Sequence, residues 1–217
     1  MDKDEYLYLD LHIHSLYSPD SYQSSRKIIE MSLRKGLSAI AIVDHDTITG
    51  GLKAKEKNKT ALEIITGIEV KTQFGDVIGL FVENGIKEKD FFRLVDKIKE
   101  QGGLVVLPHP YKKHRLEPEF LEKIDLIEVF NSRESKSSNE KAEALTSKLS
   151  LPFVAGSDAH FPWEIGRGVL KIKKPRRPYN LKEVLFSREK EIIRNYTSIS
   201  WTVLGQIIKH LKKSRLI

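Results

Sequence analysis

The chain has 217 residues, 40% hydrophobic and 31% charged, and its 37 basic and 30 acidic side chains give a net charge of +7. This balance excludes a disordered chain, and no segment approaches the roughly 18 consecutive apolar residues of a membrane span. The absence of cysteine excludes disulfides, thiolate metal ligands and a cysteine nucleophile. The length suits one domain with a sizeable core, and the acidic start lacks the order of a secretory signal, so we expect a cytoplasmic protein.

Short β-branched runs alternate with longer amphipathic patterns along most of the chain. The expected strands cover residues 6–11, 38–43, 63–69, 77–82, 104–107, 126–130, 153–155 and 168–172. The expected helices cover residues 24–35, 52–59, 88–101, 117–123 and 136–149. This alternation is typical of a parallel α/β sheet, and both an open doubly wound sheet and a closed barrel fit it. The step from residue 69 to residue 77 is too short for a helix, so a hairpin or an irregular connection is expected there.

The positive charge is concentrated near the C-terminus. Residues 1–170 carry 24 basic and 27 acidic side chains, whereas residues 171–217 carry 13 basic and 3 acidic ones, a net charge of +10. We therefore divide the chain into a body, residues 1–178, and a basic C-terminal helical segment, residues 179–217, which we expect to pack on the body. The alternative is that this segment forms a surface for phosphates, nucleic acid or an acidic membrane.

Most of the histidines lie where predicted strands end. His12 and His14 end the first strand, and His45 follows the second. His109 follows the strand at 104–107, and the Gly-Ser-Asp-Ala-His sequence at 156–160 follows the strand before it in the same way. In a parallel α/β architecture the C-terminal ends of the strands open on one face, which is where active sites lie. We therefore expect these side chains to converge at one rim.

The converging residue types are those of a metal centre without thiolates. His12 and His14 are two positions apart on an extended chain, so both imidazoles point to the same face. Imidazole and carboxylate ligands suit catalytic zinc, manganese or iron. The candidate ligands are His12, His14, Asp20, His45, Glu69, Asp76, His109, Asp158 and His160. They are too many for one tetrahedral ion and indicate two or three divalent ions.

Such a cluster predicts phosphate-ester hydrolysis. Two cations roughly 3.5–4 Å apart can clamp a phosphoryl oxygen and deprotonate a bridging water, which then attacks phosphorus. The sequence contains neither a GxxxxGK[ST] nor a GxGxxG loop, so readings based on nucleoside triphosphates or dinucleotide cofactors lose support. We predict a metal-bridging hydroxide as the nucleophile, with Glu69, Asp158 and His160 as the catalytic residues.

Three further residues are candidates for substrate binding. Arg133 follows the strand at 126–130 and could bind a phosphate bidentately, although a surface salt bridge is an equally good interpretation. Asn131 could orient the substrate or support a ligand. Lys112 could draw an anion toward the metals or simply be solvated. We expect Asp46 to orient a neighbouring imidazole rather than to bind metal.

The segments DLHIHS, VDHDT, GIEV, PHP and GSDAH, in this order and spacing, resemble the PHP (polymerase and histidinol phosphatase) family of metal-dependent phosphoesterases. The resemblance runs from Asp10 to about Arg167. It implies an α/β fold, a distorted (β/α)7 TIM-like barrel, with a three-metal site at the C-terminal rim of the strands.

The resemblance also implies three sets of metal ligands. The first set is His12, His14, Glu69 and Asp158; the second is His109 with a bridging Glu69; the third is Asp20, His45 and His160. Family members commonly place a histidine where this chain has Asp76. Because a carboxylate can still bind a hard cation, we expect the second site to survive and to favour manganese or to be more weakly filled.

The predicted substrate is a nucleotide, a small phosphometabolite or a nucleic-acid 5′ end, and the basic C-terminal segment could contribute contacts to nucleic acid. The alternative is a noncatalytic PHP-like scaffold that binds RNA or a replication or RNA-processing partner. A retired site should have lost several ligands, whereas only Asp76 departs from the expected residue type, so the enzyme is favoured. The sequence leaves open the natural substrate, the metal identity and the oligomeric state.

Overall fold

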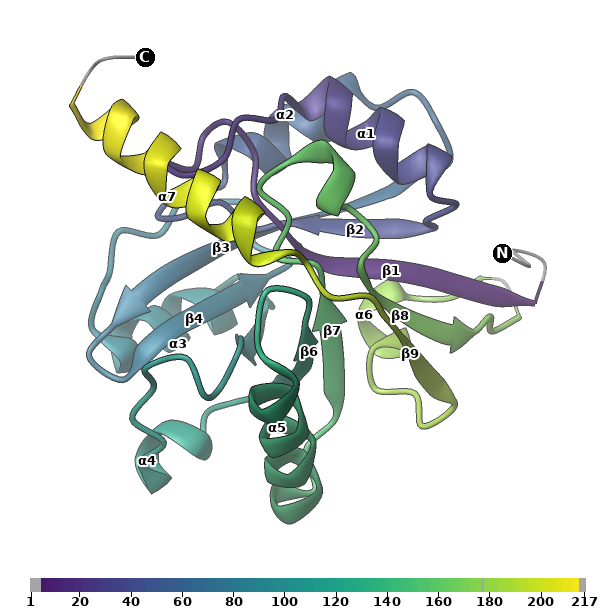
Figure 1. Cartoon of the computed structure of the whole chain (residues 1–217). Coiled ribbons are helices and arrows are strands. Elements are labelled where there is room, and N and C mark those ends of the chain that lie inside the picture. The colour runs from purple at the N-terminus through teal and green to yellow at the C-terminus, as the bar shows by residue number, and fades with distance from the viewer. Residues whose placement is uncertain (1–4, 177, 215–217) are drawn as a thin grey trace.

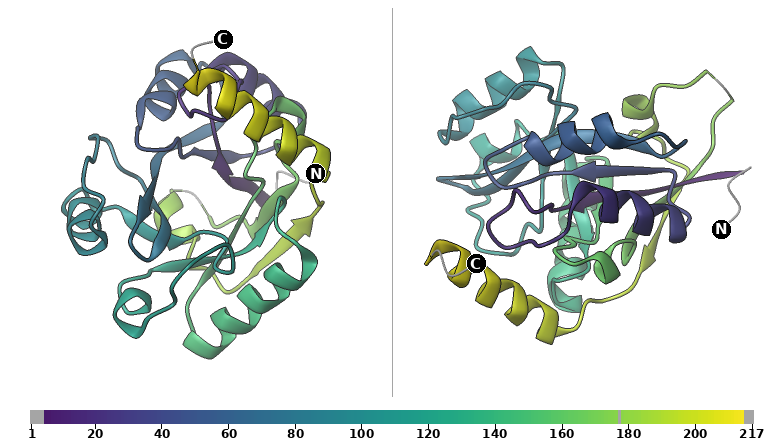
Figure 2. Two further views of the ribbon diagram at one scale, coloured as in Figure 1. Left: turned by 60° about the vertical axis from the view of Figure 1, so that its left-hand side comes forward. Right: turned by 90° about the horizontal axis from the view of Figure 1, so that it is seen from above.

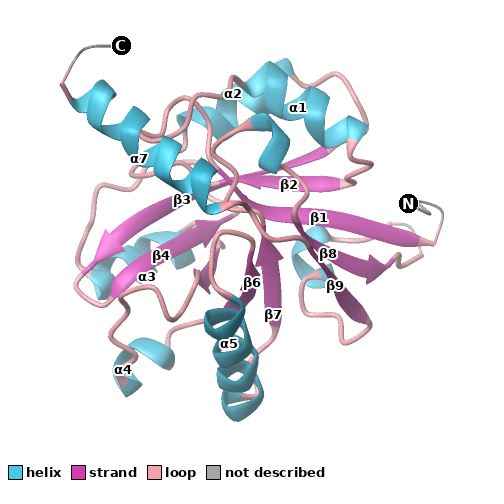
Figure 3. Ribbon diagram, viewed as in Figure 1, coloured by secondary structure: helices cyan, strands magenta, loops and turns pink. Residues whose placement is uncertain are grey.

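One mixed β-sheet organises the protein (Figures 1 and 3). The computed structural model describes residues 5–176 and 178–214. The strands are β1 (Tyr6–Ile13), β2 (Ala39–Ile42), β3 (Glu63–Thr72), β4 (Gly75–Leu80), β5 (Leu104–Leu107), β6 (Leu126–Asn131), β7 (Phe153–Gly156), β8 (Gly168–Lys173) and β9 (Lys190–Arg194). The helices are α1 (Ser25–Arg34), α2 (Thr49–Lys57), α3 (Phe91–Glu100), α4 (Pro118–Leu121), α5 (Lys136–Leu149), α6 (Leu181–Val184) and α7 (Ile199–Lys213), with a 3-10 turn, η1, at Pro162–Glu164.

The sheet has the order β7-β6-β5-β4-β3-β2-β1-β8-β9 and is only partly parallel. The neighbours β1, β2 and β3 run parallel, as do β5, β6 and β7. Between them β4 runs antiparallel to both β3 and β5. Thr72 pairs with Gly75, so the short step after residue 69 is a hairpin, which confirms one of the two alternatives expected there. Each expected strand and helix is present, with ends that differ by a few residues.

The first seven strands curve into a distorted, nearly closed barrel, which the left view of Figure 2 shows. Closure joins the end of β1 to the chain just after β7. The backbone N–H of His14 donates to the Ala159 carbonyl at 2.9 Å, and the Ala159 N–H donates to the His12 carbonyl at 3.3 Å. The buried Asp10 carboxylate reinforces this junction by accepting from the Ser157 N–H at 2.9 Å and the Gly166 N–H at 2.8 Å. The α/β barrel is therefore the correct one of the two sheet architectures.

The strands are apolar on both faces because helices cover the outside of the barrel. On β1, Leu7 and Leu9 belong to the inner cluster, and this cluster also contains Leu181 and Val184 of α6. Helix α6 therefore closes one end of the barrel interior. On the outside, α1 packs against β2, and the aromatic and aliphatic side chains of α3, beginning at Phe91, pack against β5. The histidines and carboxylates named as candidate metal ligands lie near the C-terminal ends of the parallel strands.

The last part of the chain contains more than helix. Within residues 179–217 the structure adds the strand β9, which pairs antiparallel with β8, and the short helix α6. Sequence patterning predicted a helical segment there and missed β9, because this edge strand is half-exposed and has only Ile192 and Ile193 as apolar residues. In the described part of the chain, no helix is long and apolar enough to cross a membrane.

Helix α7 lies along one side of the barrel mouth (Figures 1 and 2). Just before it, the Thr197 N–H donates to the Ser132 carbonyl at 2.7 Å, next to the end of β6. Near its other end, the Lys212 ammonium donates to three backbone carbonyls of the loop between β1 and α1, those of Leu16, Ser18 and Ser21. The helix thus connects two separate parts of the rim.

Several basic side chains of the C-terminal segment are engaged within the molecule. Lys190 donates to the carbonyls of Phe153 and Leu185, each at 2.7 Å. Arg194 pairs with Glu143 of α5 at 2.5 Å. The flanking strand β8 carries two further lysine–glutamate pairs, Lys171 with Glu191 and Lys173 with Glu189. Several of the positive charges of residues 171–217 are therefore paired within the molecule.

The packing at the closure of the barrel leaves no room for a side chain at Gly156. A Cβ atom there would lie 2.3 Å from the His12 Cβ and 2.7 Å from a Glu128 carboxylate oxygen. We expect Gly156→Ala to lower the free energy of unfolding by about 3 kcal/mol or more, measured by urea denaturation. Gly85→Ala is the matched control, because a Cβ there meets nothing within 4 Å. Equal losses for both variants would contradict this account of the junction.

Candidate metal centre

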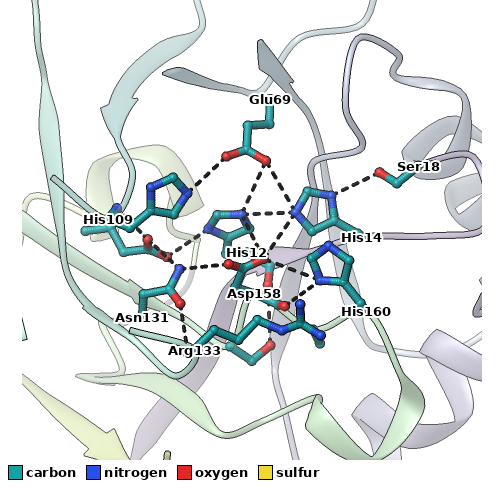
Figure 4. A network of polar contacts seen from close by, with 12 residues as sticks. His12, His14, Ser18, Glu69, His109, Asn131, Arg133, Asp158 and His160 are labelled. Atoms are coloured by element: carbon teal, nitrogen blue, oxygen red, sulfur yellow. Dashed lines mark hydrogen bonds and ion pairs between the residues drawn. The ribbon is translucent and has the colours of Figure 1, made fainter. Parts of the chain in front are cut away.

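Seven imidazole and carboxylate side chains converge at the C-terminal ends of the strands, and Figure 4 shows most of them. They come from the end of β1, the segment after β2, the middle of β3 and the segments after β5 and β7. These residues are His12, His14, His45, Glu69, His109, Asp158 and His160. All but the partly exposed His45 are buried. The rule that strand ends open on one face therefore places them correctly with respect to one another.

The orientation of three imidazoles is fixed through their Nδ1 atoms. Nδ1 of His12 lies 3.0 Å from a Glu128 carboxylate oxygen, and Nδ1 of His14 lies 3.0 Å from the Ser18 hydroxyl oxygen. His160 also uses Nδ1, on a backbone carbonyl at 2.8 Å. An imidazole that donates through Nδ1 presents the lone pair of Nε2 to the opposite side. All three rings are thereby prepared as Nε2 ligands.

The contact between His12 and His14 suits a cation. Their Nε2 atoms are 3.1 Å apart, and both lie within 3.6 Å of the same Asp158 oxygen. With Nδ1 of each ring engaged as a donor, two neutral imidazoles would point lone pairs at each other, which is unfavourable unless a proton or a metal ion lies between them. His12, His14 and Asp158 form one group whose ligand atoms all lie within 4.8 Å of one another.

Glu69 connects this group to His109 and to His45. One carboxylate oxygen is 3.2 Å from Nε2 of His109. The other is 3.1 Å from Nδ1 of His45 and 3.4 Å from Nε2 of His14, yet it is buried and has no hydrogen-bond partner among the described residues. A carboxylate surrounded by imidazole nitrogens in this way fits the bridging ligand of a metal cluster. His12, Glu69 and His109 form the second compact group.

A third compact group consists of His14, His45 and His160. Asp20, in the loop after β1, joins it, because its two oxygens lie 3.3 Å from Nε2 of His160 and 3.5 Å from Nε2 of His45. The donor sets of the three groups contain only nitrogen and oxygen atoms. They fit divalent zinc, manganese or iron, and the three groups lie next to one another because His12 and His14 each belong to two of them.

Asp76 is the one candidate ligand that the structure does not bring into these groups. It lies in the β3–β4 hairpin opposite Lys71, and among the described residues no contact joins its carboxylate to the cluster. Its backbone carbonyl instead accepts from Nε2 of His114 at 2.8 Å. The His114 ring lies 5.6 Å from the His109 ring, centroid to centroid. His114 was not named among the candidate residues in the sequence, and these contacts place it beside the cluster.

Lys112 reaches the edge of the cluster from the loop after β5. Its ammonium lies 3.8 Å from an Asp158 oxygen and 3.9 Å from a Glu134 oxygen, although the side chain is 45% exposed. Burial opposes its positive charge, but Asp158 and Glu69 outweigh that effect and raise the pKa of Lys112. Lys112 therefore presents a stable cation at the place where an anion would meet the metal ligands.

Arg133 occupies a structural position instead of facing the cluster. Its Nη2 atom donates to both Glu164 oxygens at 2.9 Å, and both side chains are almost fully buried. Glu164 also accepts from the backbone N–H groups of His160 and Phe161 at 2.8 and 2.9 Å. The salt-bridge interpretation of Arg133 is thus the one that its contacts support, except that the pair is buried. It fixes the segment that carries His160.

Asn131 and Glu128, both on β6, hydrogen-bond to the candidate ligands or to the backbone that carries them. The Asn131 amide donates to Glu128 at 3.0 Å and to Asp158 at 3.3 Å. Glu128 accepts from the His109 N–H at 2.9 Å in addition to its contact with His12. Glu128 was missed in the sequence because it lies inside an apolar strand. Its contacts show that it positions two ligand-bearing segments at once.

The expectation for Asp46 was wrong. Its side chain is exposed and pairs with Lys89 at 2.9 Å. The neighbouring Asp44 does the orienting instead: it accepts from the Ser18 hydroxyl at 3.0 Å and from the Ser15 N–H and hydroxyl. Because the Ser18 hydroxyl donates to Asp44, it accepts from the His14 ring. On a continuing strand positions 44 and 46 would share one face, but Asp46 adopts a left-handed backbone conformation with φ of 59°, so the chain turns after β2 and the two side chains diverge. The sequence pattern does not show this turn.

The electrostatics of the cluster favour cations at neutral pH. Burial opposes ionisation of Glu69 and Asp158, yet the surrounding histidines lower the pKa of both carboxyls well below their usual range. Burial also opposes a charge on His12, but Glu128 and Asp158 raise its pKa well above the ordinary value. Burial and the neighbouring His160 lower the pKa of His14 to about 3. A metal ion bound by His12 must therefore displace a proton.

Metal uptake should accordingly release protons and strengthen as the pH rises. Because the raised pKa keeps His12 protonated without metal, competition from protons is strongest at low pH and disappears above that pKa. We expect the zinc affinity, corrected for zinc binding by the buffer, to increase from about pH 6 to about pH 8. Calorimetric titration in two buffers of different ionisation enthalpy gives the number of protons released. Binding with no proton release at neutral pH would contradict the assignment.

Glu128→Gln tests the support of the imidazoles separately from the ligands. Both Glu128 oxygens accept hydrogen bonds, so an amide NH₂ in place of one oxygen would face a donor. We expect about a 10- to 100-fold loss of zinc affinity, measured by competition with a chromophoric chelator. Glu119→Gln, on the exposed side of α4, is the control and should bind zinc normally. Unchanged affinity in a folded Glu128 variant would contradict the positioning role.

Comparison with known proteins adds an independent finding. The chain matches the family described as PHP domain over residues 10–157 and a second family, described as PHP-associated, over residues 136–191. Two uncharacterized proteins of Methanocaldococcus jannaschii are 39% and 34% identical to it over 138 and 178 residues. These alignments cover 57% and 76% of this chain, and 81% and 70% of the relatives.

A solved structure shares the fold. It is a two-domain protein of Bacteroides vulgatus that contains a predicted PHP-like metal-dependent phosphoesterase. The superposition has a TM-score of 0.76 with 19% sequence identity, and covers 93% of this chain and 69% of the other. At this level of identity the similarity concerns the fold alone.

Proposed function

Because the chain belongs to the PHP domain family, which it matches over residues 10–157, we propose that the protein hydrolyses a phosphate ester with the help of two or three divalent metal ions. The proposal rests on the convergence of three overlapping ligand groups at one rim of the barrel. The ions would be held by His12, His14, Asp20, His45, Glu69, His109, Asp158 and His160. Ions in these positions would polarise the phosphoryl oxygens and lower the pKa of water enough for attack on phosphorus at neutral pH.

The chain's own residues divide the remaining work. Lys112, at the edge of the cluster, binds the phosphate oxygens. Neighbouring carboxylates keep its ammonium charged, and the negatively charged phosphate would take their place as its partner. Asn131 keeps Asp158 in place. Glu69, Asp158 and His160 lie next to the reacting phosphate. The Arg133–Glu164 pair acts at a distance by holding the backbone of His160, so we no longer assign Arg133 to substrate binding.

The substrate that the surroundings favour carries a base. Exposed aromatic rings lie on the same loops as the candidate ligands: Tyr17 and Tyr22 flank Asp20, and Tyr111 follows His109. Two of these rings each have a lysine over them: the Lys212 ammonium is 5.5 Å from the Tyr22 centroid, and the Lys141 ammonium is 5.9 Å from the Tyr111 centroid. Aromatic rings beside cations are typical of sites that stack nucleobases. We therefore favour a nucleotide or a nucleic-acid 5′ end over a phosphometabolite without a ring.

The basic C-terminal segment gives weaker support to nucleic-acid binding than its charge suggests. Many of its cations already pair with carboxylates or carbonyls of the protein, as Lys190 and Arg194 do. Contacts to nucleic acid through this segment would have to use the remaining ones. The noncatalytic scaffold remains the alternative, and it is disfavoured because the three ligand groups are all present.

Removal of a ligand from the group of His12, Glu69 and His109 should abolish hydrolysis. We expect Glu69→Ala and His109→Ala, loaded with manganese, to lose activity toward p-nitrophenyl phosphate, adenosine 5′-monophosphate and a 5′-phosphorylated RNA oligonucleotide, because this group would lose a ligand and no longer hold its ion. Products are measured by mass spectrometry, and circular dichroism confirms folding. Glu63→Ala, at the opposite end of β3, is the control. Full activity of either ligand variant would contradict the metal assignment, and an inactive wild-type protein that binds RNA tightly would support the scaffold.

A further inference from the structure

Glu134 is a mostly buried carboxyl group beside the proposed centre that no step above uses. It lies in the turn after β6, where its backbone N–H donates to the Asn131 carbonyl at 3.2 Å. Its side chain is 15% exposed. No sequence pattern distinguishes Glu134 from an exposed glutamate. Its position relative to Lys112 suggests a chemical role.

The Lys112 ammonium contacts both Glu134 and the candidate ligand Asp158. The Lys112 ammonium is 3.9 Å from a Glu134 oxygen and 3.8 Å from an Asp158 oxygen. A phosphate that binds Lys112 and the metal ions together would lie on the side of Asp158. Glu134 would then face the outer part of the substrate, where the alcohol departs. Glu134 and Asp158 thus share Lys112 as their cationic partner.

The charged groups around Glu134 come from three strand ends. Lys112 and His109 follow β5, Asp158 follows β7, and Glu128 lies on β6 itself. Burial is the largest influence and raises the pKa of Glu134; Lys112 and His109 lower it, and Asp158 and Glu128 raise it further. A bound phosphate adds negative charge and neutralises part of the Lys112 field, so it shifts Glu134 further toward the protonated form.

We propose that Glu134 is the general acid that protonates the leaving-group oxygen of the phosphate ester. This role rests on the proposed function. The attacking water adds its oxygen to phosphorus and loses one proton to solvent, while the bond between phosphorus and the leaving oxygen breaks. That oxygen takes the proton of the Glu134 carboxylic acid and departs as an alcohol. Glu134 then regains a proton from solvent, so one water is consumed for each ester hydrolysed.

A positioning role for Glu134 makes a different prediction. If the carboxylate only held Lys112 in place, its loss would weaken phosphate binding and slow every ester alike. A general acid matters instead in proportion to the basicity of the leaving group. Two esters that differ only in the leaving group therefore separate the two roles.

The experiment compares p-nitrophenyl phosphate, whose leaving group departs as a stable anion, with adenosine 5′-monophosphate, whose leaving alcohol needs a proton. If the wild-type enzyme prefers diesters, bis-p-nitrophenyl phosphate and a dinucleotide replace them. We expect Glu134→Gln to lower kcat about 10²- to 10⁴-fold on the nucleotide and to leave the nitrophenyl ester within about threefold. Glu134→Asp should recover part of the loss. Glu140→Gln, on the exposed side of α5, is the control for both esters.

Two further measurements do not depend on a single rate. The wild-type rate on the nucleotide should fall as the pH rises through the Glu134 pKa, and this falling limb should be absent in Glu134→Gln. In the zinc-loaded protein, carboxyl NMR should show the pKa of Glu134 rising when inorganic phosphate is added. Equal slowing of both esters, no slowing, or an unchanged pKa would overturn the general-acid role. An inactive wild-type enzyme would instead contradict the phosphoesterase proposal, so the two failures are distinguishable.

Discussion

The buried Asp10 carboxylate joins the two edges of the sheet that meet when the barrel closes, β1 and the segment after β7. The rest of the site depends on that junction. Its oxygens accept from the backbone of Ser157 and Gly166, which lie far along the chain from β1. Burial raises the pKa of Asp10 to about 6 even though these hydrogen bonds oppose the shift. β1 supplies His12 and the segment after β7 supplies Asp158. The junction therefore sets the distance between candidate ligands that come from the two edges of the barrel sheet. Ligand geometry is thus a consequence of how the sheet closes.

The cluster itself is a costly arrangement without bound cations. Imidazoles and carboxylates lie within 4.8 Å of one another in the interior, where unpaired charges and opposed lone pairs are unfavourable. The fold holds them there through groups that are not ligands, chiefly Glu128, Asp44 and the Arg133–Glu164 pair. His109 and Asp158 also adopt left-handed backbone conformations, with φ of 30° and 51°, which are strained for residues with a Cβ. Such strain at ligand positions is typical of sites in which the surrounding structure enforces geometry.

The sequence pattern predicted the strands, the helices and the convergence of most candidate ligands, and the family resemblance implied the barrel, but neither predicted the groups that support the candidate ligands. Strand ends can be found from patterning, and in this architecture strand ends converge, so His45 and His109 could be placed together without knowledge of any contact. The ion pair of Arg133 joins residues 31 positions apart, and no local pattern reveals it. The choice between Asp44 and Asp46 depends on how the chain leaves β2. The strand β9 is stabilised by pairing with β8 rather than by its own composition.

The hydrogen bonds from the Lys212 ammonium to the loop after β1 join segments that are synthesised at different times. The Lys212 ammonium holds carbonyls 191 to 196 positions earlier, in the loop that presents Asp20. During synthesis on the ribosome, the ligands from β1 to Asp158 can assemble before α7 has emerged. The loop that carries Asp20 gains its contacts with Lys212 only after α7 has been synthesised. Nascent chains should therefore acquire the ligand groups in sequence, with the group around Asp20 last to reach its final rigidity.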